Sequence, residues 1–276
     1  MANSKEKKRL DLLLVEKQLF DTRQKAQAAI MAGIVFVDGN RQTKAGTQIS
    51  LLSQIEIKGN NCPYVSRGGI KLEKALHLFE IDVNNLTCID AGASTGGFTD
   101  CLLQHGASFV YAIDVGYGQI DWKLRNDPRV KVIEKTNVRY IKSEEIFNNK
   151  CFKKPVLCTA DLSFISVTKV LENISSLMDN QKEFIILIKP QFEAGKDQVP
   201  KTGVVKNKSI HIEVIEQFFD FCCNLNLVPI NLTYSPLKGP SGNIEYLCHL
   251  TSKKKESIIN YEFIESIVYN AHEQLK

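Results

Sequence analysis

The residues best suited to chemistry in this sequence are four ionisable side chains that stand beside apolar runs typical of buried strands. Asp161 and Lys189 each directly follow such a run, and Glu245 opens the last one. Ligands of an open α/β sheet gather at the carboxyl ends of its strands, and an antiparallel last strand would begin at that same edge. Lys71, in a helix pattern before the first strand, can reach the edge as well. We therefore expect two lysines and two carboxylates to lie close together.

A Lys/Asp/Lys/Glu cluster suits the removal of a proton from a ribose hydroxyl, which is a poor acid and needs a strong base held neutral. Lys189 is the expected base, because partial burial and a neighbouring cation both lower the pKa of a lysine. Lys71 would be that cation and would hold the hydroxyl or a phosphate. Asp161 and Glu245 would orient the lysines and the 2′-hydroxyl. Each residue alone is as often a solvated strand terminus, so the hypothesis depends on all four meeting.

A glycine-rich turn, Asp90-Ala91-Gly92-Ala93-Ser94-Thr95-Gly96-Gly97-Phe98-Thr99, lies between an apolar run and a helix pattern. Such a turn lets the backbone approach a nucleoside ligand closely, and Asp114 follows at a spacing where a carboxylate accepts hydrogen bonds from ribose hydroxyls. Asp90 would repel a pyrophosphate but suits the positive groups of S-adenosylmethionine. The turn therefore predicts an S-adenosylmethionine site, with a purely structural strand-to-helix turn as the alternative.

The elements that must position these residues alternate between strand and helix patterns. Strands are expected at 86–89, 109–113, 130–133, 156–160, 184–188, 228–234 and 244–250, with helices between them at 119–126, 166–178 and 209–225. This order predicts an α/β fold with a Rossmann-like, mostly parallel sheet covered on both faces. Only residues 235–243 separate the last two strands, which is too short for a helical crossover, so the last strand should be antiparallel. An amphipathic helix should begin near Glu256 and end the chain.

The first sixty residues indicate a separate basic module. They hold ten Lys/Arg and six Asp/Glu, which accounts for the whole net charge of +4. Two short helices should precede a small antiparallel sheet, with Thr22 capping the second helix and Asp38-Gly39 forming a hairpin turn. A basic module on a neutral body suggests polyanion binding, although a solvated pair of surface helices is an equal alternative. The expected domains are 1–60, a linker at 61–66, the α/β domain at 67–252 and the final helix at 253–276.

This module resembles the S4-like RNA-binding domain. The matching residues are Arg9-Leu10-Asp11, Thr22-Arg23-Gln24-Lys25-Ala26, Ile30-x-x-Gly33-x-Val35-x-Val37-x-Gly39 and Ile55-x-Ile57. The resemblance implies recognition of structured RNA through its backbone and shape, with Arg23 and Lys25 as the foremost contacts. The other expected RNA contacts are Arg9, Lys17, Arg41, Lys44 and, after the linker, Arg67.

The remainder is similar to the TlyA family, whose second half belongs to the FtsJ-like ribose 2′-O-methyltransferases. The similarity rests on 64–72, the turn at 90–100, Asp114 to Gln119, Thr136-Asn137-x-Arg139, 161–166, 187–193, Gly203-Val204-Val205 and Gly242-Asn243-x-Glu245-Tyr246. It implies methylation of cytidine riboses in ribosomal RNA, with the family's catalytic tetrad on Lys71, Asp161, Lys189 and Glu245. The implied cofactor-binding residues are Asp90, Gly92, Ala93, Ser94, Gly96, Gly97, Phe98, Asp114, Val115, Asn137 and Asp161.

Composition narrows the class of protein. The eight cysteines show no C-x-x-C pair and the five histidines are scattered, so neither a disulfide framework nor a metal site is expected. No apolar run approaches the length of a membrane helix, and the polar start is no secretory signal. These features predict a cytoplasmic protein without stable membrane association, and they do not determine the oligomeric state. The resemblance to the TlyA family implies that the protein acts on ribosomal RNA or ribosomal subunits.

Three alternatives remain. Some TlyA-like proteins are called haemolysins, so a membrane-active cytolysin is one, although the lack of an apolar segment disfavours it. A methyltransferase acting on another RNA, or on an amino group or a base carbon, is the second; no proline follows Asp161, and Cys158 lies inside a strand pattern. A non-catalytic RNA-binding protein is the third, and the intact tetrad disfavours it.

Overall fold

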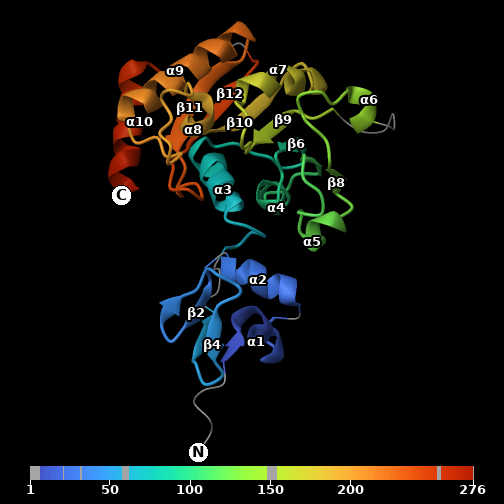
Figure 1. The fold of residues 1–276 in the computed structure, drawn as a ribbon. Coiled ribbons are helices and arrows are strands. Elements are labelled where there is room, and N and C mark those ends of the chain that lie inside the picture. Colours follow the sequence, from blue (N-terminus) through green and yellow to red (C-terminus); the bar gives the residue numbers. More distant parts are fainter. Residues whose placement is uncertain are drawn as a thin grey trace, which may run out of the picture. The chain divides into compact units, whose positions relative to one another are not determined.

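The chain folds as two units, Met1–Asn61 and Cys62–Lys276 (Figure 1). Among the described residues, one hydrophobic cluster lies in the first unit and two lie in the second. The computed structural model describes residues 7–20, 22–31, 33–57, 62–147, 154–253 and 256–275.

The first unit is a small α+β fold. The apolar face of its first helix packs on the second helix, as the pattern predicts. Thr22 Oγ1 accepts a hydrogen bond from the Lys25 amide, and Asp38 and Gly39 both have positive φ, as a two-residue hairpin turn requires. A short strand before the first helix, which the pattern does not predict, pairs antiparallel with residues 48–50. The described elements are β1 (Lys7–Arg9), α1 (Leu10–Glu16), α2 (Arg23–Met31), β2 (Val35–Val37), β3 (Asn40–Arg41), β4 (Gln48–Ser50) and β5 (Ile55–Ile57).

The second unit is an α/β fold built on a seven-stranded sheet. Its strands are β6 (Thr87–Ala91), β7 (Phe109–Ile113), β8 (Val130–Ile133), β9 (Leu157–Ala160), β10 (Glu183–Ile188), β11 (Val228–Tyr234) and β12 (Tyr246–Thr251). Its helices are α3 (Gly68–Leu78), α4 (Gly97–Gln104), α5 (Trp122–Arg125), α6 (Ser143–Ile146), α7 (Thr168–Leu177), α8 (Pro190–Glu193), α9 (Lys208–Asn224) and α10 (Tyr261–Gln274).

The sheet has the order β11-β12-β10-β9-β6-β7-β8. The pairs from β10 through β9, β6 and β7 to β8 are parallel, whereas β12 pairs antiparallel with both β10 and β11. The predicted Rossmann-like, mostly parallel sheet with an antiparallel last strand is confirmed. The carboxyl ends of β9 and β10 and the start of β12 therefore meet at one edge.

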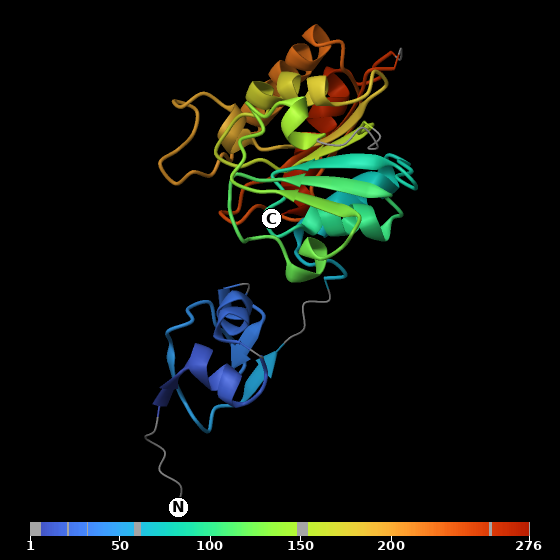
Figure 2. The same ribbon diagram turned by 90° about the vertical axis from the view of Figure 1, so that its right-hand side faces the viewer.

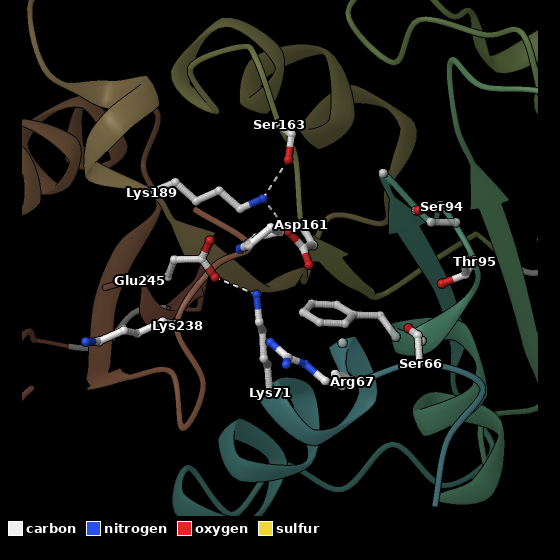
Figure 3. A pocket seen from close by; sticks show the side chains of 16 residues that line it. Ser66, Arg67, Lys71, Ser94, Thr95, Asp161, Ser163, Lys189, Lys238 and Glu245 are labelled. Carbon is white, nitrogen blue, oxygen red and sulfur yellow. Dashed lines mark hydrogen bonds and ion pairs between the residues drawn. The ribbon is translucent and has the colours of Figure 1, made fainter. Parts of the chain in front are cut away.

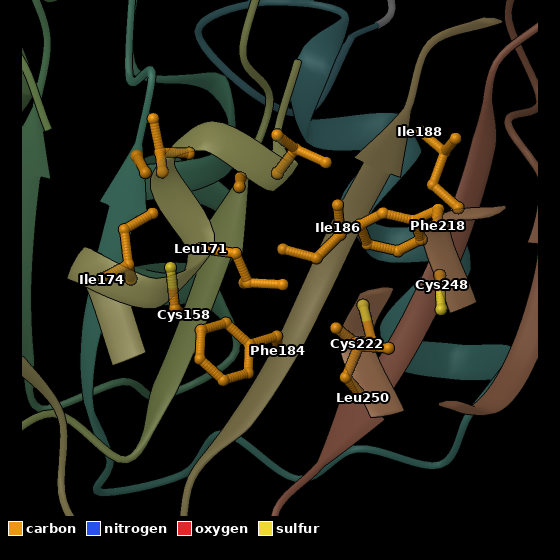
Figure 4. Close-up of a cluster of buried hydrophobic side chains, with 14 of the residues drawn as sticks. Cys158, Leu171, Ile174, Phe184, Ile186, Ile188, Phe218, Cys222, Cys248 and Leu250 are labelled. Atoms are coloured by element: carbon orange, nitrogen blue, oxygen red, sulfur yellow. The ribbon is translucent and has the colours of Figure 1, made fainter. Parts of the chain in front are cut away.

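Helices cover both faces of this sheet (Figures 1 and 2): α7, α9 and α10 lie on one face, and α3, α4 and α5 lie on the other. Strand β10 shows why its sequence is a continuous apolar run. Phe184, Ile186 and Ile188 pack in the hydrophobic cluster under α7, α9 and α10 (Figure 4). Ile185 and Leu187 pack in the cluster on the opposite face, under α3, α4 and α5. Because neighbouring side chains alternate between two buried faces, the five residues from Phe184 to Ile188 are all apolar, and the next polar residue is Lys189, directly after the strand.

The C-terminal helix begins later than expected. Its described start is Tyr261, where the side chain of Asn260 accepts a hydrogen bond from the Phe263 amide at 2.9 Å. An Asn cap satisfies an amide that would otherwise have no partner, so the helix starts there although the apolar pattern extends further towards the N-terminus. The buried face of α10 is Ile264, Val268 and Ala271.

Candidate functional site

Two ion pairs bring the four predicted catalytic side chains together at one edge of the sheet (Figure 3). Lys71 Nζ lies 2.5 Å from Glu245 Oε2, and Lys189 Nζ lies 2.6 Å from Asp161 Oδ1. Lys71, Lys189 and Glu245 are 8%, 6% and 1% exposed. Charged groups this buried are stable only when paired, so the cluster is a built arrangement and not a set of solvated strand termini.

The topology explains why these residues meet. Asp161 and Lys189 directly follow β9 and β10, which are parallel neighbours in the sheet. Glu245 directly precedes β12, whose antiparallel direction places its start at the same edge. Lys71 lies in the first turns of α3, which packs against β12. Residues from four separate segments are therefore fixed by strand ends and one helix.

The four side chains line a cavity of about 280 Å³. Six other predicted site residues line it too: Arg67, Gly92, Ala93, Ser94, Gly97 and Phe98. The remaining lining residues have no role predicted from the sequence; they are Ser66, Gly68, Thr95, Ser163, Lys238 and Pro240. The position of Ser163 could have been predicted from the sequence, because it lies only two residues after Asp161, which directly follows a buried strand.

The glycine-rich turn separates this cavity from a second one and needs its first glycine. Gly92 has φ +83°, and a Cβ there would stand 2.6 Å from the Asp161 carbonyl oxygen. Only glycine lets the turn after β6 approach the turn after β9 this closely. Gly92, Ser94, Asp161 and Ser163 line both cavities, so the two spaces adjoin along these residues.

The second cavity, of about 510 Å³, is lined by three further predicted cofactor residues: Asp114, Val115 and Asn137. Asp114 Oδ2 accepts from the Ser94 amide at 2.8 Å and Oδ1 from the Gly116 amide at 2.6 Å. Each carboxylate oxygen keeps a second lone pair, so Asp114 can still accept a ligand hydroxyl. The lining residues without a predicted role are Ile113, Gln119, Thr136, Val138, Leu162, Phe164, Ile165 and Val170.

Two of the predicted cofactor residues, Asp90 and Gly96, line neither cavity. Asp90 is fully buried and accepts from Thr99 Oγ1 at 2.6 Å and from Thr159 Oγ1 at 3.4 Å. Burial raises the pKa of Asp90 to about 7. Its contacts join β6 to α4 and β9, so Asp90 braces the turn from behind.

In the first unit, the predicted RNA contacts Arg9 and Arg23 share one carboxylate. Arg9 donates to Asp11 through Nε and Nη2 at 3.0 and 2.9 Å, and Arg23 donates through Nε at 3.0 Å. Asp11 is fully buried, and the guanidinium bonds hold its pKa well below the usual range. The two arginine side chains stay 40% and 51% exposed, so one buried anion orients two accessible cations.

The other predicted RNA contacts of this unit lie at its surface. Arg41 Nε donates to the Gly33 carbonyl at 2.9 Å and so supports the end of α2. Lys17 is exposed directly after α1, Lys25 is exposed in the first turn of α2, and Lys44 is exposed in the loop before β4. The described geometry therefore leaves all of these side chains accessible to a large ligand.

Among the residues that the structure describes, no three His, Cys, Asp or Glu side chains form a group that could hold a metal ion. None of the described helices has both the length and the apolar composition needed to cross a membrane.

Comparison with known proteins gives the family. The S4 domain matches residues 8–52, and the FtsJ-like methyltransferase matches residues 64–252. The 16S/23S rRNA (cytidine-2′-O)-methyltransferase TlyA of Mycobacterium tuberculosis is 39% identical to this chain, and the match covers 95% of this chain and 96% of the TlyA sequence. Hemolysin A of Brachyspira hyodysenteriae is 44% identical to this chain, and the match covers 87% of this chain and 98% of the Hemolysin A sequence. A solved structure from Streptococcus thermophilus, assigned as a hemolysin, has a TM-score of 0.76 and 39% identity, covering 97% of this chain and 96% of that one. The chain therefore belongs to the FtsJ-like methyltransferase family, in the TlyA group that carries an S4 domain in front of the methyltransferase domain.

Proposed function

We propose that this protein transfers a methyl group from S-adenosylmethionine to the 2′-hydroxyl of a cytidine ribose in ribosomal RNA, in the cytoplasm. The observation that carries the proposal is the pair of buried Lys–carboxylate contacts in a cavity that adjoins a second, larger one. A base for the hydroxyl and a space for a nucleoside cofactor thus lie on opposite sides of one glycine turn.

We assign the second cavity to S-adenosylmethionine. Asp114 would accept from its ribose hydroxyls, Asn137 and Val115 would flank the adenosine, and Gly92, Ala93 and Ser94 would face the rest of the molecule. A Cβ at Gly92 would stand 2.6 Å from the Asp161 carbonyl oxygen, so a side chain there would push apart the two turns that line both cavities. When bound, S-adenosylmethionine supplies an electrophilic methyl group on a positively charged sulfur.

The residues around the first cavity would act on the ribose. Lys189 takes the proton of the 2′-hydroxyl, and the ammonium that forms is stabilised by the Asp161 carboxylate. Lys71, held by Glu245, lies beside the same cavity and would hold the ribose or a neighbouring phosphate. A positioned base of this kind contributes about 10²–10⁴-fold to a rate, and fixing the hydroxyl in line with the methyl group adds to it.

The first unit would recruit the RNA. Arg9, Arg23 and Arg41 present guanidinium groups, and Lys17, Lys25 and Lys44 add ammonium groups that suit phosphates. Arg67, which lines the first cavity, would contact RNA close to the target nucleotide.

The test is methylation of unmodified ribosomal RNA and ribosomal subunits by the purified protein with S-adenosylmethionine, followed by mass-spectrometric mapping. We expect a methyl group on a cytidine ribose oxygen, and none when the target nucleotide carries a 2′-deoxyribose. Methylation of a base, or continued transfer to the deoxy substrate, would overturn the proposal.

A further inference from the structure

The amine of Lys189 is held by two acceptors and not by Asp161 alone. Lys189 Nζ donates to Ser163 Oγ at 2.8 Å in addition to Asp161 Oδ1 at 2.6 Å, and the nitrogen lies between the two oxygens in Figure 3. The Lys189 side chain is 7% exposed, and its described surroundings open on the first cavity. Ser163 is exposed and lines both cavities.

Two acceptors determine where a neutral amine can present its lone pair. A neutral lysine nitrogen carries two hydrogens and one lone pair in the three staggered directions about its Cε–Nζ bond. If Asp161 were the sole acceptor, one hydrogen would be fixed and the lone pair could occupy either remaining direction. With Ser163 as the second acceptor both hydrogens are fixed, so the lone pair takes the last direction.

We propose that Ser163 is a positioning residue which, together with Asp161, directs the Lys189 lone pair into the cavity where the ribose hydroxyl binds. This inference rests on the proposed function and deepens it. In the proton transfer the 2′-hydroxyl breaks its O–H bond and Lys189 forms a third N–H bond. The oxygen forms its new bond to the methyl group while the methyl–sulfur bond breaks, and the electron pair of that bond stays on the sulfur, which leaves as a neutral thioether. Ser163 and Asp161 keep the same two hydrogens before and after the transfer, so neither has to move.

The turn that carries Ser163 is built to stay in place. The Asp161 amide donates to the Ala91 carbonyl at 3.1 Å, and the Asp161 carbonyl lies against Gly92, where a Cβ would stand 2.6 Å from it. Phe164, the residue after Ser163, has φ +66°, which is uncommon for a non-glycine residue, and its ring centroid lies 5.4 Å from that of Phe192. A rigid turn suits a residue whose task is orientation.

The test compares Ser163→Ala and Ser163→Thr in the full chain, with Ser176→Ala as the control for loss of an exposed hydroxyl far from the cavity. Single-turnover rates with saturating RNA and S-adenosylmethionine isolate the chemical step. For Ser163→Ala we expect a loss of about ten- to hundredfold in that rate, with RNA and S-adenosylmethionine affinities unchanged within about twofold. Because the ammonium also loses an acceptor, the rising limb of the rate against pH should move to lower pH. Ser163→Thr keeps the hydroxyl, so its single-turnover rate and the position of the rising limb of its pH–rate profile should both match those of the wild type.

The inference would be overturned if Ser163→Ala had the single-turnover rate and the pH–rate profile of the wild type. It would also be overturned if Ser163→Thr were as slow as Ser163→Ala. A uniform loss of rate without movement of the limb would indicate a general structural defect and would overturn it too. Failure of the proposed function has a different signature: the wild-type protein would then place no methyl group on ribose, or Lys189→Ala would retain full activity.

Discussion

The Lys71 ammonium donates to the Glu245 carboxylate at 2.5 Å and thereby joins residues 174 positions apart in the chain. The side chains are 10% and 1% exposed, so this pair has left bulk water. Removing two charges from water costs several kcal/mol per ion, and the mutual attraction offsets that cost only while both partners are present. The pair therefore ties α3 to the start of β12 beside the first cavity.

Breaking this pair from one side should destabilise the second unit. We expect Glu245→Ala to lower the free energy of unfolding by about 3–5 kcal/mol, because it leaves the Lys71 charge buried without a partner. Urea titration followed by the fluorescence of Trp122, the single tryptophan, reports on this unit. The double variant Lys71→Met/Glu245→Leu removes both charges and should recover most of the loss while methyl transfer stays absent. A double variant as unstable as Glu245→Ala would show that the unpaired charge is not the cause.

Removal of the proposed base should separate chemistry from binding. We expect Lys189→Ala to reduce methyl transfer by at least about 10²-fold, since no other described amine lies against Asp161 and Ser163. RNA binding by gel shift and S-adenosylmethionine binding by calorimetry should persist. Lys169→Ala, which removes an exposed lysine from α7, is the matched control and should keep full activity. Full activity in Lys189→Ala would exclude lysine as the base.

Loss of charge from the first unit should weaken RNA binding in a way that salt reveals. We expect Arg23→Ala/Lys25→Ala to lower RNA affinity and to reduce the slope of log K against log salt by about 1–2, since each phosphate contact contributes about 0.7–0.9. The control Lys169→Ala/Lys182→Ala removes two positive charges from the second unit and should leave the slope unchanged. An unaltered slope in the first variant would mean that the RNA is held elsewhere.

The buried carboxyl of Asp90 should make stability depend on pH. Its pKa in the folded protein is raised to about 7 by burial, above the value in an unfolded chain. The folded state therefore binds the proton more tightly, so this contribution to stability is complete below about pH 4 and is lost as pH rises through about 7. Asp90→Asn keeps an acceptor for Thr99 but does not titrate. Relative to the wild type, it should gain about 2 kcal/mol in free energy of unfolding between pH 5 and pH 8. An equal pH dependence in both proteins would contradict the raised pKa.

The edge at which the candidate site lies is predictable from the sequence for a simple reason. A strand buried on both faces is a continuous apolar run, so the first charged residue after it marks the strand end, as at Asp161 and Lys189. The direction of β12 follows from the short connection before Glu245. These local rules predict the fold and the meeting of the four ionisable side chains, and they also identify the glycine turn.

Local rules fail where a side chain has several possible partners. Nothing in the spacing shows that Ser163 turns towards Lys189, that Asp90 points behind its turn to Thr99, or that Asp11 collects two guanidinium groups. Each orientation depends on how the packed helices, strands and turns place the possible partners around the residue and exclude its other rotamers. Residue types and strand ends thus follow from the order of amino acids, whereas the hydrogen-bond partners arise only when the packed sheet brings the segments together, because burial makes an unpaired polar group too costly to keep.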